Sequence, residues 1–324
     1  MSAKVKLNKR ILDFFGEYLV LVAILLLVIV TIFVEPKFLT IGNMTNIMRQ
    51  FGPLIMVALG MTFVIVGGFI DLSVAGLMSL VAVLTLAMIE PLGQLPALII
   101  GLLIGVVCGL INSFLILISG AITQAEGLFI TYGMSVVYGG LALTFTGGVT
   151  EHMSYMSCPY TIFTEIGTGT VGFFSTSFII FLVVLAILYV FHEKTYLGRT
   201  INLTGGNKTA ARLSGISINK SIVIIYTLSG LMAALGAIIL FSRVTTASPV
   251  LGRNFETNAI LAVVVGGTRL SGGKGSVIRT VIGTMLVILL ANCMNLLGVS
   301  VFMQNVMRGA ILILAIWLDS HKED

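Results

Sequence analysis

The sequence has few charged residues and little tryptophan, cysteine or proline. Lys and Arg number 18 and Asp and Glu 13, so only 10% of the 324 residues are charged, whereas 57% are hydrophobic. So few charges cannot cover the surface of a water-soluble fold of this size. The composition therefore excludes an ordinary soluble domain and predicts that most of the chain lies within a lipid bilayer.

Other scarcities narrow the function. The three cysteines, Cys108, Cys158 and Cys293, have no metal-ligand spacing, and their odd number argues against a disulfide framework. The net charge of +5 forms no basic stripe, so we expect no nucleic-acid partner. No Ser/His/Asp, histidine-cluster or paired-carboxylate pattern lies within an apolar run. We therefore expect neither an enzyme nor a cofactor or metal bound by this chain.

Long apolar runs dominate what is present. Ten lie at about 18–34, 51–69, 72–89, 96–118, 128–146, 173–191, 221–242, 257–266, 277–297 and 302–318. About 20 helical residues cross a ~30 Å hydrocarbon core, which nine runs match or nearly match. The run 257–266 reaches only about 15 Å. We expect an all-α polytopic membrane protein with about ten transmembrane segments, one a half-helix, in one domain over residues 1–324. The 36 glycines indicate that its helices pack closely.

The basic residues predict the orientation. If every run reverses the chain, 13 of the 18 Lys and Arg fall on one side, in residues 1–16, the loop 192–220, a loop near 266–279 and the tail 319–324. Loops that face the cytoplasm carry such an excess of positive charge. We therefore expect both termini in the cytoplasm. The segment 147–172 then lies outside, where we expect a solvated connection.

The loop 192–220 contains a capped short helix. Gly205-Gly206-Asn207 predicts a break, Asn207 is a good N-cap for a helix Lys208–Ser214, and Gly215 ends that helix. We expect turns on both sides of it. If the basic residues of this loop served only to set the membrane orientation, the loop would not need an N-cap, a short helix and a glycine stop.

Two polar breaks interrupt the apolar runs without a long loop. Gly67 and Gly68 precede Phe69, Asp71 and Ser73. A second polar cluster contains Glu256 and Asn258, at the start of the half-helix. Non-helical backbone at membrane depth is tolerated where protein or a water-filled cavity satisfies it. All five side chains are therefore candidates to line a translocation path. The alternatives are an N-cap at the inner surface for Asp71 and a helix start at the outer surface for Glu256.

Three stretches in this order resemble the ribose-type permeases of ATP-binding-cassette importers. They are Gly68-Phe69-Ile70-Asp71-Leu72-Ser73-Val74, then Leu197 to Ile216, then Ala262 to Thr268 with Gly272-Gly273-Lys274-Gly275 and Asn292 to Ser300. The similarity covers about residues 17–318. By this resemblance the chain is the transmembrane permease subunit of an importer in the bacterial cytoplasmic membrane.

The resemblance also implies partners and a coupling loop. It implies a cytoplasmic subunit that binds and hydrolyses ATP, an external solute-binding protein, and a second permease, identical or paralogous. The loop helix would dock on the ATPase. Its candidate residues are Gly198, Arg199, Gly205, Gly206, Asn207, Ala210, Ala211, Arg212 and Gly215. The solute would be a neutral monosaccharide or similar small polar molecule, because few ionisable groups lie in the apolar runs.

The sequence also departs from the family pattern. Phe69 stands where the family has a second glycine, Asn258 where it has an acid, and Arg279 where it has a glycine. A bulky Phe69 would be expected to narrow the path. The glycine-rich loop 266–275 lacks the spacing of a nucleotide-binding loop. The alternative function is an ion-gradient-driven transporter or channel, whose only candidate acids are Asp71, Glu126 and Glu256.

Overall fold

Most of the apolar runs fold as helices long enough to cross a bilayer. The structure, a computed structural model, describes residues 22–121 and 123–320. By length and composition seven described helices can cross a membrane: α2 (Ile41–Val66), α3 (Val74–Leu92), α4 (Gln94–Ile118), α5 (Gln124–Thr146), α7 (Thr176–Lys194), α10 (Ile218–Val244) and α12 (Val277–Leu296). Shorter apolar helices are Val22–Val34, α11 (Phe255–Val265) and Val301–Trp317 within α13 (Val301–Ser320). The all-α polytopic fold is confirmed, and the count of about ten crossings stays a prediction.

The remaining elements are short and lie at the ends of the bundle. The helical ones are η1 (Pro36–Leu39), η2 (Met153–Tyr155), α6 (Thr161–Thr168), α8 (Tyr196–Gly206) and α9 (Lys208–Leu213). The strands are β1 (Glu151–His152), paired antiparallel with β4 (Thr246–Ala247), and β2 (Thr170–Val171), paired antiparallel with β3 (Phe174–Ser175). Each strand has two residues, so these strands hold loops between helices together and do not form a sheet layer.

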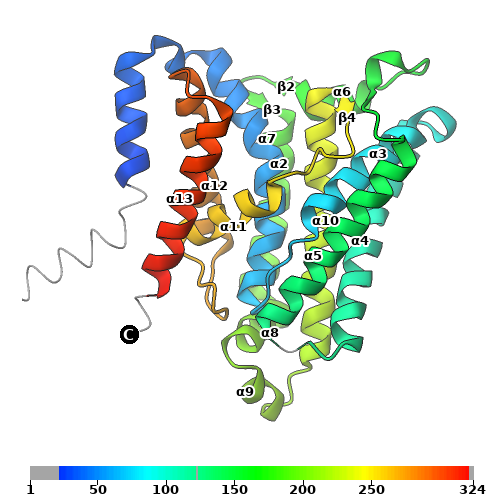
Figure 1. Ribbon diagram of the computed structural model, residues 1–324, viewed down its shortest axis with the longest axis vertical. Helices are drawn as coiled ribbons and strands as arrows, with labels where there is room; N and C mark the ends of the chain where they lie inside the picture. The colour runs from blue at the N-terminus through cyan, green and yellow to red at the C-terminus, as the bar shows by residue number, and fades with distance from the viewer. Residues whose placement is uncertain (1–21, 122, 321–324) are drawn as a thin grey trace, which may run out of the picture.

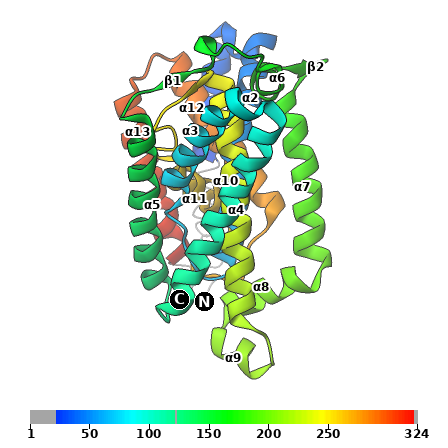
Figure 2. The same cartoon turned by 90° about the vertical axis from the view of Figure 1, so that its right-hand side faces the viewer.

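Helices α2 and α10 form the centre of the bundle (Figures 1 and 2). α10 packs against α4, α2 and α3, and α2 packs against α12 and α11. Every residue of α2 from Phe51 to Val66 is buried. Outer helices instead expose apolar side chains, among them Val136 on α5 and Val183 and Ile187 on α7. Such faces suit lipid or another apolar surface.

Glycine brings α4 and α10 into backbone contact. A Cβ on Gly105 would meet the methyl of Ala234 and the carbonyl of Gly230, and a Cβ on Gly109 would overlap the carbonyl of Tyr226. Only residues without a side chain permit this approach, which transmembrane helices use to gain van der Waals contact. The close packing expected from the glycine content is therefore present at the central helix pair.

The outer connection 147–172 is more ordered than the solvated loop expected from its mixed sequence. Within it, Phe163 on α6 is fully buried and packs against Phe241 of α10, with ring centroids 5.3 Å apart. A Cβ on Gly167 would overlap the backbone of Ser242. Most of the segment is exposed, as expected for a solvated connection, but α6 closes over the end of α10, a contact that local polarity does not reveal.

The end of α13 lies on the same side of the bundle as α8 and α9 (Figures 1 and 2). If α8 and α9 face the cytoplasm, the C-terminal end of α13 does too. Residues 1–16 and 321–324, for which we expected a cytoplasmic location, lie outside the described residues. The orientation therefore stays a prediction.

Candidate functional site

The short helix of the loop 192–220 forms nearly as the sequence predicts. The side-chain oxygen Oδ1 of Asn207 accepts a hydrogen bond from the backbone of Ala210 at 2.9 Å, which caps α9. Gly215 has φ +79° and follows the last turn. The segment before Asn207, expected to contain turns, is the helix α8. The Oγ1 atom of Thr195 accepts from the backbone of Gly198 at 3.1 Å, so this helix has a cap of its own.

The candidate coupling residues divide into exposed and buried sets. Gly198 is buried, because a side chain there would overlap the carbonyl of His192, and Ala211 is buried on the inner side of α9. Gly205 is partly buried. The exposed members are Arg199, Gly206, Asn207, Ala210, Arg212 and Gly215. These exposed residues form the part of the loop that a partner can reach.

The glycine pairs of the three motifs meet at one place, which we call the glycine junction. It joins Gly68 after α2, Gly205 at the end of α8, and Gly272 and Gly273 in the loop after α11. The backbone N–H of Gly273 donates to the carbonyl of Val66 at 2.8 Å. A Cβ on Gly205 would overlap that same carbonyl, and one on Gly272 would lie 2.8 Å from the Cα of Gly68. Three segments far apart in the chain thus touch backbone to backbone.

Phe69 links the junction to the first residue of α9. The ammonium nitrogen of Lys208 lies 3.8 Å from the centroid of the Phe69 ring, within the range of a cation–π contact. The ring is fully buried, has its centroid 6.1 Å from that of Tyr226, and occupies space that a side chain at Gly127 would take. The bulky residue therefore packs inside the subunit rather than facing an open path. Burial lowers the pKa of the Lys208 ammonium, and the carboxylate of Glu126 opposes that shift.

The chain between α2 and α3 is non-helical, and α5 satisfies its backbone. Thr131 of α5 accepts from the N–H of Leu72 at 3.1 Å and lies 3.3 Å from the carbonyl of Ile70, to which its hydroxyl can donate. The N–H of Phe69 donates back to Val64 at 3.0 Å. Protein groups thus replace the water that an unwound segment needs inside a membrane.

Asp71 lies at the centre of a buried polar network. Its Oδ1 atom accepts from the backbone N–H of Ser73 at 3.0 Å and from the Ser73 hydroxyl at 2.6 Å, and Oδ2 accepts from Ser229 at 2.8 Å. Asn112 donates to Ser73 at 2.7 Å and accepts from Tyr138 at 3.0 Å. Helices α4, α5 and α10 and the segment just before α3 therefore contribute to one network.

This placement differs from the interpretation of Asp71 as an N-cap at the inner surface. Ser229 is eleven residues into α10, roughly 16 Å along it, so the carboxylate lies near mid-depth and not at the inner surface. Asp71 and Ser73 have no exposed surface in this conformation. They hold the unwound segment in place, and a path-lining role for them stays a prediction.

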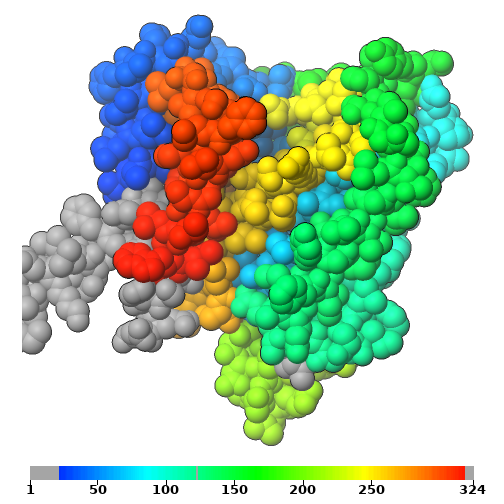
Figure 3. All heavy atoms as spheres, viewed as in Figure 1, coloured from blue at the N-terminus to red at the C-terminus, as the bar shows by residue number. Residues whose placement is uncertain are grey.

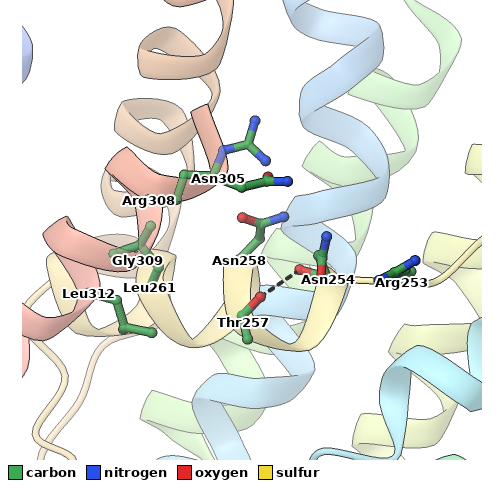
Figure 4. A pocket seen from close by; sticks show the side chains of 9 residues that line it. All are labelled: Arg253, Asn254, Thr257, Asn258, Leu261, Asn305, Arg308, Gly309 and Leu312. Carbon is green, nitrogen blue, oxygen red and sulfur yellow. Dashed lines mark hydrogen bonds between the residues drawn. The ribbon is translucent and has the colours of Figure 1, made fainter. Parts of the chain in front are cut away.

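Two cavities flank the half-helix α11 on its outer side. One, of about 290 Å³, lies between α11 and α13; the other, of about 240 Å³, lies among α2, α10, α11, α12 and α13. Asn258 and Arg308 line both. Figure 4 shows Asn258 of α11 and Asn305 and Arg308 of α13 directed into the same space. In Figure 3 the surface between α13 and α5 is hollowed, with α11 at its floor.

Of the two candidates on α11, only Asn258 lines these cavities. Glu256 is half-buried, and its Oε2 atom has no hydrogen-bond partner among the described residues. The half-helix begins beside Pro53 and Leu54, well below the outer end of α2. This is the depth that the short apolar run 257–266 indicated.

Sequence reasoning missed the other polar residues of the cavities. Gln50, Arg243, Asn305 and Arg308 were not singled out, although each lines one or both. Arg308 had a usable signal, since it is the only charge within the run 302–318. Charges inside transmembrane segments face cavities or partners and mark functional sites.

The fold and these sites define a class of protein. Broken helices at membrane depth, satisfied by neighbouring helices and flanked by polar cavities, are the construction of a solute permease. The family model described as "Branched-chain amino acid transport system / permease component" matches residues 43–316. The chain belongs to this family.

Curated relatives cover almost the whole chain. The ribose import permease of Escherichia coli (strain K12) is 34% identical over 94% of this chain and 93% of its own length. The ribose import permease of Bacillus subtilis (strain 168) is 38% identical over 92% of this chain and 90% of its own length. The galactose/methyl galactoside import permease of Escherichia coli (strain K12) is 32% identical over 98% of each chain. These names describe permeases, not enzymes. No solved structure matches the chain.

Proposed function

We propose that this chain is the channel-forming subunit of an ATP-driven importer that moves a monosaccharide or a similar small polar solute into the cytoplasm. Relatives named for import of ribose and galactose support the sugar class, and each covers more than nine-tenths of the chain. ATP is bound and hydrolysed by a cytoplasmic partner that docks on the exposed residues of α8 and α9. A binding protein delivers the solute at the outer side of a bacterial cytoplasmic membrane.

The observation that carries the proposal is the glycine junction. It places the loop that would meet the ATPase in backbone contact with the unwound segment after α2 and with the loop after α11. A displacement of α8 and α9 would move both of these segments, because the three segments touch through their backbones with no side chains between them. The same contact gives the three family motifs one shared purpose.

A second permease subunit would complete the path. Figure 3 shows a hollow in the surface between α13 and α5. Asn305 and Arg308 line the cavity between α11 and α13, and α13 also exposes Phe302 and Val306. Two such hollows opposed across a dimer axis would enclose a central route. Whether the second copy is identical or paralogous does not affect this geometry.

The alternative, an ion-gradient-driven transporter, has fewer groups to use. Two of its three candidate acids are engaged structurally. Asp71 accepts three hydrogen bonds from Ser73 and Ser229, and Glu126 forms a capping box with Thr123 at the start of α5. An ion-gradient-driven transporter would also have no need for α9 or for the glycine junction.

Co-purification tests the proposal. The tagged chain is expressed with its chromosomal neighbours and purified in mild detergent, and we expect a partner with nucleotide-binding motifs to remain bound. The complex is then reconstituted in liposomes. Sugar should accumulate in the lumen only when ATP is present there, in the vesicles whose ATPase partner faces the lumen. Uptake that needs an ion gradient and ignores ATP would refute the proposal and support the alternative.

A further inference from the structure

The cavities beside α11 collect arginines from three separate segments. Arg243 comes from the end of α10, Arg253 from the segment before α11, and Arg308 from α13. The sequence favoured a neutral solute because few ionisable groups lie in the apolar runs. Folding brings Arg308, from within an apolar run, and two cations from just outside such runs around two cavities that share lining residues, which changes that expectation.

No carboxylate among the described residues lines either cavity. The ion pair between His192 and Glu193 lies at the opposite end of the bundle. Arg243 donates to Asn46 at 3.3 Å and Arg308 to Gln304 at 3.4 Å, both neutral amides. Glu256 interacts electrostatically with Arg253, but its side chain lines neither cavity. The site therefore carries net positive charge.

Arg308 is partly buried and has limited contact with bulk water. It lies seven residues after Val301, roughly 10 Å along a helix whose only other charged residue, Asp319, is at the far end. Its Nε atom is buried and has no hydrogen-bond partner among the described residues. Charge at such depth is costly unless it faces a water-filled cavity or an opposite charge. Its guanidinium group provides parallel donors that suit two oxygens of a carboxylate or phosphate.

The remaining lining suits hydroxyl groups. Asn258 and Asn305 point into the same space as Arg308, and Gln50 lines the second cavity. Amides donate hydrogen bonds to hydroxyls and accept them, but they carry no negative charge that could neutralise an arginine. The cavities thus combine one anion-binding element with several positions for hydroxyl groups.

We propose that the cavities sharing Asn258 and Arg308 bind a polyhydroxylated solute that carries one anionic oxygen group, as a sugar acid or a sugar phosphate does. Arg308 contacts the anionic group, and Asn258 and Asn305 contact hydroxyls. This inference rests on the proposed import of a sugar-like solute and specifies the charge of that solute.

Binding to the purified permease in phosphatidylcholine nanodiscs tests this inference without the ATPase. The probes are ribose, ribonate and ribose 5-phosphate, a matched series from glucose, and inorganic phosphate. We expect an anionic member to bind at least about tenfold more tightly than its neutral parent, as one charge-assisted contact implies. Its affinity should fall with rising salt. Arg308→Gln should weaken anion binding about tenfold and leave neutral binding unchanged, while Arg308→Lys should retain part of the difference.

Lys37→Gln, an exposed cation of the same outer side, serves as the matched control and should change nothing. The inference is overturned if the neutral sugars bind as well as the anions, if no anionic sugar binds saturably, or if phosphate alone binds equally well. It is also overturned if Arg308→Gln weakens the permease dimer but not anion affinity, since Arg308 would then belong to the subunit interface. None of these results bears on ATP-dependence, which the reconstituted complex tests separately.

Discussion

The ammonium nitrogen of Lys208, the first residue of α9, lies 3.8 Å from the centroid of the Phe69 ring. Phe69 immediately follows Gly68 of the glycine junction and precedes Asp71 by two residues. The contact therefore spans the distance between the loop that would meet an ATPase and the unwound segment between α2 and α3. A residue that departs from the family pattern thus has a definite partner in this chain.

Removing this contact should weaken coupling more than folding. We expect Lys208→Met and Phe69→Leu each to reduce solute-stimulated ATPase activity of the reconstituted complex several-fold. In the double variant the two effects should not add, and the interaction energy should be about 0.5–2 kcal/mol from melting curves in detergent. Lys220→Met, an exposed lysine at the start of α10, is the control. Fully additive effects would show that the two side chains act independently.

Adjacent glycines of α8 provide a sharper test of the glycine junction. Gly205→Ala places a methyl group on the carbonyl of Val66, whereas a Cβ at Gly206 has its nearest neighbour, the Cα of Gly273, at 3.7 Å. We expect Gly205→Ala to cost about 1–3 kcal/mol of stability or to displace α8 and abolish coupling, as overpacking does elsewhere. Gly206→Ala should behave as wild type in both melting temperature and stimulated ATPase activity. Equal behaviour of the two variants would contradict the backbone contact.

Gly205 also shows where sequence reasoning reached its limit. The loop helix, its cap at Asn207 and its stop at Gly215 follow from local preferences and could be predicted. The sequence predicted a break at Gly205, but Gly205 lies within α8, and what requires a glycine there is the close approach of the Val66 carbonyl. Contacts between segments far apart in the chain leave no local pattern, and the cluster of Arg243 and Arg308 was missed for the same reason.

The network around Asp71 should contribute strongly to stability. Asp71→Ala leaves the N–H and hydroxyl of Ser73 and the hydroxyl of Ser229 without their acceptor, and we expect a loss of about 3 kcal/mol or more. Ser229→Ala removes one donor and should cost about 1–2 kcal/mol. Thr144→Ala, whose exposed hydroxyl donates only within α5, should have little effect. Melting in detergent measures all three, and an unchanged Asp71→Ala would show that the network is not structural.

The orientation has a direct test. If α8 and α9 meet a cytoplasmic ATPase, the end of α13 faces the same compartment (Figure 1). A reporter that is active only in the cytoplasm should be active when fused after residue 324, and a reporter active only outside should be inactive. Insertion of the same reporters into the outer connection at Gly148, an exposed glycine, should give the opposite pattern. Activity outside for the C-terminal fusion would invert the whole topology.

Two variants on the half-helix α11 can distinguish a side chain that lines the path from one that is needed for folding. Asn258 lines both cavities and lies in the first turns of α11. Asn258→Ala should therefore lower uptake several-fold at normal abundance and melting temperature. Glu256 lines neither cavity, and its Oε2 atom has no hydrogen-bond partner among the described residues. Glu256→Gln should therefore retain uptake and melt at the same or a higher temperature, because the amide avoids burying a charge. Uptake into proteoliposomes, measured beside the amount of inserted protein, compares the two variants. Normal uptake in both would exclude a path beside α11, and a lowered melting temperature for Asn258→Ala would assign that side chain to folding instead.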